Sequence, residues 1–142
     1  MKFSSISKIL KDAKSGKMFI LVDDEQRENE GDLIIPASKI KSNLINFMAK
    51  HGRGLICLTL CQKQVDKLNL PLMSPQNITR SQTAFTVSID AKKGISTGIS
   101  AHDRTKTIKT AIKNKVSSRD IVSPGHVFPI VAKNGGVLVR AG

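Results

Sequence analysis

The apolar residues of this chain are gathered into short runs separated by polar segments, and this pattern limits the folds open to it. The runs at residues 18–22 and 55–60 are too short for helices and are typical of buried strands. A third apolar run, at 33–35, ends at Pro36. No run reaches about 18 apolar residues, so the sequence predicts no membrane span. Lysines interrupt the apolar residues of segment 1–16, which argues against a secretory leader. We therefore expect a cytoplasmic protein.

Two longer segments repeat apolar side chains at helical spacing. Residues 5–14 have this pattern, begin with a serine and are followed by Gly16, which is typical of a helix end. Residues 103–114 have it too, and either Ser100 or His102 stands where a residue can cap the helix. Both segments are predicted to be amphipathic helices.

The remaining segments predict further strands and two shorter helices. Residues 83–89 alternate apolar and polar side chains as a strand does. Residues 127–131 and 137–139 flank an Asn-Gly-Gly turn and predict a hairpin. Shorter helical patterns lie at 44–52 and 65–68. Because strands and helices mix without regular alternation, we expect a single α+β domain with a mixed or antiparallel sheet packed with helices.

The net charge and the cysteines limit the classes of function that the chain can have. The formal net charge of +12 suggests nucleic acid as one candidate partner. The lysines are scattered, however, and the chain has no Trp or Tyr for base stacking, so we predict no nucleic-acid binding. A positive field also attracts small phosphorylated substrates. Cys57 and Cys61 are too few for a disulfide framework and lack a second pair to hold zinc, so they are expected to be reduced thiols.

One loop concentrates the acidic residues of this basic chain. Six of the eleven carboxylates lie between residues 23 and 32: Asp23, Asp24, Glu25, Glu28, Glu30 and Asp32. Their mutual repulsion requires a compensating cation or arginine, and Arg27 lies among them. Hard divalent cations take oxygen ligands and usually keep several waters, so a Mg²⁺ site is one interpretation. A solvated acidic loop is the plainer alternative.

At this loop the sequence resembles the 3,4-dihydroxy-2-butanone 4-phosphate synthases of riboflavin biosynthesis. The resemblance begins with residues 21–33 (LVDDEQRENEGDL) and continues in the same order almost to the end of the chain. The further matching segments are 51–58 (HGRGLICL), 83–90 (TAFTVSID), 94–104 (GISTGISAHDR), 124–129 (PGHVFP) and 135–142 (GGVLVRAG).

The resemblance implies a lyase reaction on ribulose 5-phosphate. The sugar phosphate is rearranged and loses C4 as formate, which leaves 3,4-dihydroxy-2-butanone 4-phosphate. Enolisation comes first in the mechanism usually drawn, and it needs a Lewis acid at the carbonyl and a base that moves protons. The resemblance therefore implies Mg²⁺ or Mn²⁺ as cofactor. It also implies a homodimer that acts on a small molecule and binds neither nucleic acid nor membrane.

The resemblance also implies roles for individual residues. Glu28 matches the family's metal ligand, while Glu30, Cys57 and His126 match catalytic positions. The substrate-binding positions matched are Arg27, Glu28, Asp32, Thr97, Arg140, Ala141 and Gly142. Taken without the resemblance, Cys57 is a small buried hydrophobe at a strand, His126 a turn residue and Arg140 an exposed charge.

The family pattern extends beyond the end of this sequence. It continues with a histidine that is the second metal ligand and then with another essential glutamate, whereas the sequence stops at Gly142. We therefore expect residues 1–142 to form a C-terminally incomplete synthase domain, as a fragment or as a shortened homologue. On this expectation the chain alone binds metal weakly and has little or no turnover. The alternative function is an inactive homologue that binds a sugar phosphate or metal.

Overall fold

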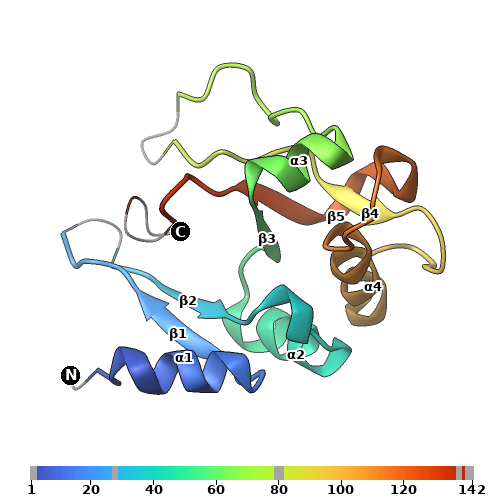
Figure 1. The fold of residues 1–142 in the computed structure, drawn as a ribbon. Helices are drawn as coiled ribbons and strands as arrows, with labels where there is room; N and C mark the ends of the chain where they lie inside the picture. The colour runs from blue at the N-terminus through green and yellow to red at the C-terminus, as the bar shows by residue number, and fades with distance from the viewer. Residues whose placement is uncertain (1–2, 27–28, 79–81, 137–138, 140–142) are drawn as a thin grey trace.

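The computed structural model describes residues 3–26, 29–78, 82–136 and 139 (Figure 1). Its helices are α1 (Ile6–Lys14), α2 (Ser42–Phe47), α3 (Gln62–Leu68) and α4 (Ala101–Ala111). Its strands are β1 (Phe19–Val22), β2 (Gly31–Ile34), β3 (Cys57–Leu60), β4 (Ile89–Ala91) and β5 (Ile121–Val131). A wide helical turn, Met48–Gly52, extends α2 over the rest of the helix predicted at 44–52.

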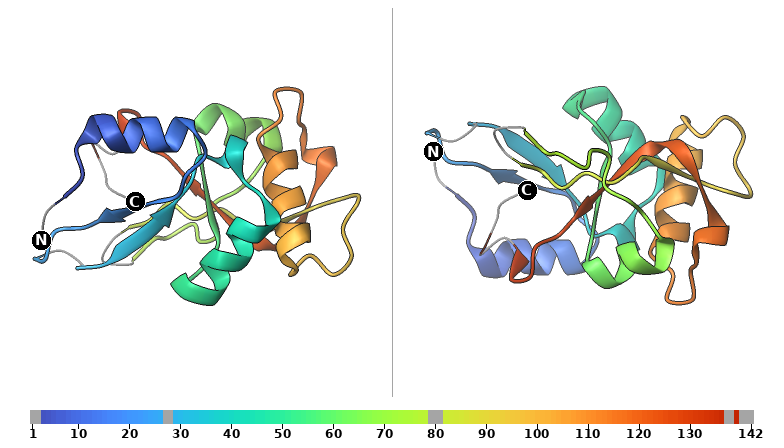
Figure 2. Two further views of the ribbon diagram at one scale, coloured as in Figure 1. Left: turned by 90° about the horizontal axis from the view of Figure 1, so that it is seen from below. Right: turned by 90° about the horizontal axis from the view of Figure 1, so that it is seen from above.

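The strands form two separate sheets. Strands β1 and β2 pair as an antiparallel hairpin. The second sheet has the order β3-β5-β4, in which β3 is parallel and β4 antiparallel to the central strand β5. The hairpin and α1 lie at one end of the molecule and α4 with β4 at the other (Figure 2). This arrangement confirms the predicted α+β class with mixed and antiparallel strands.

The two long predicted helices are confirmed, and local chemistry explains where they begin. The Ser5 hydroxyl accepts the backbone N–H of Lys8 at the start of α1, although the bond is long at 3.4 Å. At α4 the Ser100 hydroxyl accepts the N–H of Asp103 at 3.0 Å. Ser100 is thus the cap, and His102 lies inside the first turn. Such caps satisfy amide groups that a helix cannot pair internally.

The prediction that residues 18–22 form a buried strand is wrong about burial. Strand β1 is present, but its side chains alternate between partly buried and exposed. Ile20 and Val22 are among the exposed large hydrophobic residues. The physical reason is that β1 belongs to a two-stranded antiparallel hairpin, which has one face against the protein and one face open.

The predicted strand at 83–89 is also largely wrong. Continuous pairing begins only at Ile89, and Phe85 makes an isolated bridge. The reason is that this segment divides its hydrogen bonds between two neighbours. The N–H of Thr86 donates to the Pro129 carbonyl on β5, whereas the N–H of Val87 donates to the carbonyl of Pro71. The hairpin predicted at 127–131 and 137–139 includes residues outside the described part of the chain.

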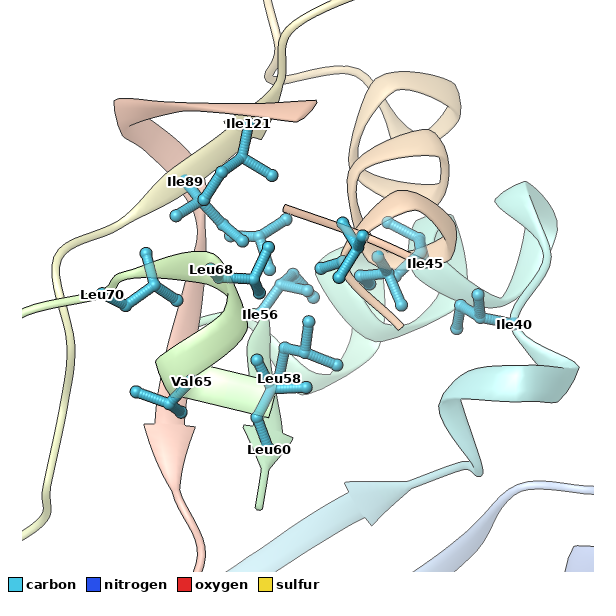
Figure 3. Close-up of a cluster of buried hydrophobic side chains, with 14 residues drawn as sticks. Ile40, Ile45, Ile56, Leu58, Leu60, Val65, Leu68, Leu70, Ile89 and Ile121 are labelled. Atoms are coloured by element: carbon cyan, nitrogen blue, oxygen red, sulfur yellow. The ribbon is translucent and has the colours of Figure 1, made fainter. Parts of the chain in front are cut away.

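The buried core is formed by the mixed sheet and by helices α2, α3 and α4. A cluster of buried aliphatic side chains fills the space between them (Figure 3). Its residues are Ile40, Ile45, Ile56, Leu58, Leu60, Val65, Leu68, Leu70, Ile89, Ile108, Ala111, Val116, Ile121 and Val127. The cluster holds β3, β4 and β5 against the helices, and so fixes the strands that carry the polar residues described below.

We predict that Leu68→Ala lowers the free energy of unfolding by about 2 to 5 kcal/mol, because Leu68 is only 1% exposed and its removal leaves a cavity. The measurement is urea denaturation followed by circular dichroism. Ile78→Ala is the matched control, since Ile78 is 92% exposed, and should change stability by no more than about 0.5 kcal/mol. Similar losses in both variants would contradict the assignment of this core.

Candidate functional site

A cleft of about 240 Å³ separates β2 from β3, and it brings two of the predicted site residues together. Asp32 of β2 and Cys57 of β3 both line it. Cys57 begins β3 and is an exposed residue with a free thiol. The alternative that it is a small buried hydrophobe is therefore wrong. Cys61 is also an exposed free thiol, as expected for reduced cysteines.

The thiol of Cys57 is held in its protonated form. Desolvation by the walls of the cleft raises its pKa, although the residue as a whole is exposed, and the negative charge of Asp32 raises that pKa further. Both effects disfavour the thiolate. At neutral pH Cys57 is therefore suited to donate a hydrogen bond to a bound molecule rather than to attack it.

We predict that Asp32→Asn makes Cys57 react faster with iodoacetamide at pH 8, because loss of the Asp32 charge lowers the pKa of the thiol. The expected increase is roughly two- to fivefold, because the thiolate is the form that reacts. Mass spectrometry measures alkylation at each cysteine, with Cys61 as the internal reference. An unchanged ratio between the two rates would contradict the electrostatic contact between Asp32 and Cys57.

His126 lies on β5 and is held by a carboxylate of β4. The Oδ2 atom of Asp90 lies 2.8 Å from Nδ1 of His126, and Oδ1 accepts the His126 backbone N–H at 3.0 Å. His126 lies two residues before Phe128, which faces Cys57 in the parallel pairing of β3 with β5. Ile130 lines the cleft together with Cys57. The imidazole and the thiol are therefore carried by neighbouring strands of the mixed sheet.

The loop before α4 is organised by the buried carboxylate of Asp103. Its Oδ2 accepts the Ser96 hydroxyl at 2.9 Å, the Gly98 N–H at 3.0 Å and the Ser96 N–H at 3.2 Å. The amides of Ser96 and Gly98 are thus already bonded within the protein. Thr97 lies between them and is exposed. Burial alone raises the pKa of Asp103, but hydrogen bonds from Ser96 and Gly98 outweigh it and lower the pKa to about 2.

We predict that Asp103→Asn destabilises the protein at pH 7 and does so less as the pH falls. The pKa in the folded protein is about 2, below the ordinary 3.8, so ionised Asp103 stabilises the fold. That contribution is complete above about pH 4 and is lost as the pH falls toward 2. Urea midpoints of both proteins at pH 7 and pH 3 measure it. A gap of the same size at both pH values would contradict the prediction.

The structure describes only some of the remaining predicted site residues. Glu30 is exposed immediately before β2, and its backbone carbonyl accepts the N–H of Asp23 at 3.0 Å. The predictions for Arg27, Glu28, Arg140, Ala141 and Gly142 fall outside the described residues. Within the described part of the chain, no group of three or more His, Cys, Asp or Glu side chains could hold a metal ion. No helix of that part is long and apolar enough to cross a membrane.

Asp90 is a site residue that the sequence analysis missed. It ends the matching segment 83–90 and directly follows the fully buried Ile89. A carboxylate at the end of an apolar strand pattern is a signal that it has a buried partner, because an unpaired buried charge is strongly disfavoured. The identity of that partner, however, depends on the register between β4 and β5.

The fold and the site define a class of α+β proteins whose mixed sheet carries a free thiol and a carboxylate-bound imidazole on neighbouring strands. Comparison with known proteins then identifies the family. The family model described as 3,4-dihydroxy-2-butanone 4-phosphate synthase matches residues 7–142. The chain belongs to the 3,4-dihydroxy-2-butanone 4-phosphate synthase family, which confirms the resemblance seen in the sequence.

Individual relatives agree with this membership. The 3,4-dihydroxy-2-butanone 4-phosphate synthase of Photobacterium phosphoreum is 51% identical over 142 residues, which are 100% of this chain and 39% of that protein. The synthase of Neisseria meningitidis serogroup B is 54% identical over 139 residues, 98% of this chain and 38% of its own length. The chain therefore spans about two-fifths of the length of these curated relatives.

Solved structures of relatives have the same fold. A 3,4-dihydroxy-2-butanone 4-phosphate synthase in complex with two magnesium ions superposes with a TM-score of 0.94 at 39% identity, covering 99% of this chain and 65% of that one. A two-domain synthase from A. baumannii gives a TM-score of 0.92 at 48% identity, covering 98% of this chain and 41% of that one.

Proposed function

We propose that this chain belongs to an enzyme that converts ribulose 5-phosphate into 3,4-dihydroxy-2-butanone 4-phosphate and formate, in riboflavin biosynthesis. The observation that carries the proposal is the cleft lined by both Asp32 and Cys57, whose thiol has its pKa raised by the Asp32 charge. His126 lies on β5, the strand that pairs with β3. These are residues that the family resemblance assigns to the reaction. Membership of the synthase family over residues 7–142 supports it.

Each site residue has its own proposed role in the enolisation and rearrangement of the substrate. His126 has a ring nitrogen suited to taking a proton from a substrate carbon and returning it to a neighbouring one near neutral pH. The protonated thiol of Cys57 donates a hydrogen bond to a sugar hydroxyl. Asp32 lies across the cleft and accepts a hydrogen bond from another hydroxyl. Arg27 and Arg140 are proposed to bind the substrate through its phosphate, for which the planar guanidinium is well suited.

A divalent cation, Mg²⁺ or Mn²⁺, is part of the proposal. The donor chemistry of the acidic loop fits a hard cation, with Glu28 as the proposed ligand, since such ions take carboxylate oxygens and retain waters. When bound, the cation supplies Lewis acidity at the substrate ketone. One solved relative is described as a complex with two magnesium ions, which supports a divalent metal in this family. A cytoplasmic homodimer completes the proposal.

The proposed function is tested by measuring formate released from ribulose 5-phosphate in the presence of Mg²⁺. Two proteins are compared: this chain, and this chain joined to the residues that follow the matched region in the Photobacterium phosphoreum synthase. Metal-dependent formate release by the joined protein, abolished by a chelator, is the expected result. If both proteins fold and bind ribulose 5-phosphate but neither releases formate, the alternative of binding without turnover replaces the proposal.

We predict that Glu28→Gln abolishes metal-dependent formate release by the joined protein, because the variant keeps the side-chain volume but removes an anionic ligand. Glu25→Gln is the matched control from the same loop, and it should leave turnover within about twofold of the parent. Isothermal titration with Mn²⁺ measures metal affinity in both. Retained activity in Glu28→Gln would remove Glu28 from the metal site.

A further inference from the structure

The segment 96–98, which lies in the loop before α4, is held by one carboxylate rather than by strand or helix pairing. Three donors reach the same oxygen, Oδ2 of Asp103: the hydroxyl and the N–H of Ser96, and the N–H of Gly98. Asp103 itself is only 3% exposed. Hydrogen bonds to an ionised acceptor are stronger than those between neutral groups, so the conformation of this segment depends on Asp103.

The helix that carries Asp103 is itself fixed to the mixed sheet. Thr107 lies one turn further along α4 and is fully buried, and its hydroxyl accepts the N–H of Ala91 on β4 at 2.9 Å. At the start of the helix, the Ser100 hydroxyl accepts the N–H of Asp103 at 3.0 Å. Asp103 is therefore fixed relative to β4, and it connects the segment 96–98 to the sheet.

The segment that Asp103 holds packs directly on His126. Gly98 is buried, and a Cβ at this position would overlap Asp90 Oδ2 and lie 2.6 Å from His126 Nδ1. Its φ of +92° is a backbone conformation that favours glycine. Consecutive α-carbons are about 3.8 Å apart, so Thr97 lies beside the same histidine. The tertiary structure thus brings a predicted substrate-binding residue next to a predicted catalytic one.

The side chain of Thr97 is not used by the fold. Thr97 is exposed, and its hydroxyl forms no hydrogen bond with any residue that the structure describes. The residues on either side of it, in contrast, both donate their N–H groups to Asp103. A hydroxyl can donate and accept a hydrogen bond, and a backbone that is already ordered lowers the entropic cost of binding. Thr97 is therefore well placed to bind a polar ligand.

We propose that Asp103 is a positioning residue of the site: by holding Ser96 and Gly98 it fixes Thr97 beside His126, where the Thr97 hydroxyl binds an oxygen of the sugar phosphate. The inference rests on the proposed function, which supplies the substrate. Because Asp103 is buried, it acts through the backbone of the segment 96–98 and not by contact with the substrate. Loss of Asp103 should therefore remove the contribution that Thr97 makes to substrate binding.

Amide hydrogen exchange, followed by NMR, tests the first half of the proposal without any assay of activity. The amides of Ser96 and Gly98 should be protected in the unmodified chain and should exchange at least about tenfold faster in Asp103→Ala. Asp120→Ala is the matched control, because Oδ2 of Asp120 accepts the N–H and the hydroxyl of Ser117 at 2.9 and 3.1 Å in the same way. It should leave both amides unchanged. Unprotected Ser96 and Gly98 amides in the unmodified chain would overturn the proposal.

A double-mutant cycle in the joined protein tests the second half. Thr97→Val should raise the KM for ribulose 5-phosphate roughly three- to tenfold, the range for loss of one hydrogen bond. Asp103→Ala should raise KM by a similar factor, and adding Thr97→Val to it should raise KM less than about twofold further, because the hydroxyl is already misplaced. Asp103→Asn keeps an acceptor oxygen and should restore part of the KM. Ser96→Ala, a milder variant that keeps the carboxylate, should couple to Thr97→Val in the same direction even if Asp103→Ala does not fold.

The outcomes separate this inference from the proposed function. If the joined protein is active but Thr97→Val raises KM by the same factor with and without Asp103, and with and without Ser96, then Asp103 is only structural and the inference alone fails. If the unmodified joined protein releases no formate, the proposed reaction fails, and the exchange rates still decide whether Asp103 holds the segment 96–98.

Discussion

The structure depends on the way in which strand β5 is shared between two partners. Its residues 128–131 pair with β3 in parallel, whereas residues 121, 122 and 127 pair with β4 in antiparallel register. The change of partner coincides with a register shift, and Gly125 allows the backbones to touch there. Without that shift, the polar residues of β5 would follow a regular pleat and His126 would not meet Asp90.

Two buried carboxylates use this arrangement in different ways. Asp103 accepts hydrogen bonds from the loop in front of its own helix, and so shapes the segment that carries Thr97. Asp90 accepts two bonds from a single residue of the neighbouring strand. Gly98 contacts both systems, since its N–H donates to Asp103 and its α-carbon abuts Asp90 and His126. A helix start and a strand crossing are therefore coupled through one glycine.

The distribution of charge suits the phosphorylated substrate proposed above. The chain carries a net charge of +12, and such a field attracts phosphorylated molecules over a distance of about a Debye length. The acidic loop reverses the sign locally, next to the cleft lined by Asp32 and Cys57. Positive surroundings with a small negative centre suit a phosphate and a divalent cation bound side by side.

The sequence by itself determined the features that depend on near neighbours along the chain. The positions of α1 and α4, the class of the fold and the acidic loop follow from spacing and from hydrogen bonds within a few residues, and long family motifs predicted the site residues. Only the tertiary structure decided that β1 has an exposed face, that Cys57 faces a cleft and that Asp90 holds His126 across 36 residues of sequence. These depend on strand register and on which faces are covered, and no local pattern encodes either of them.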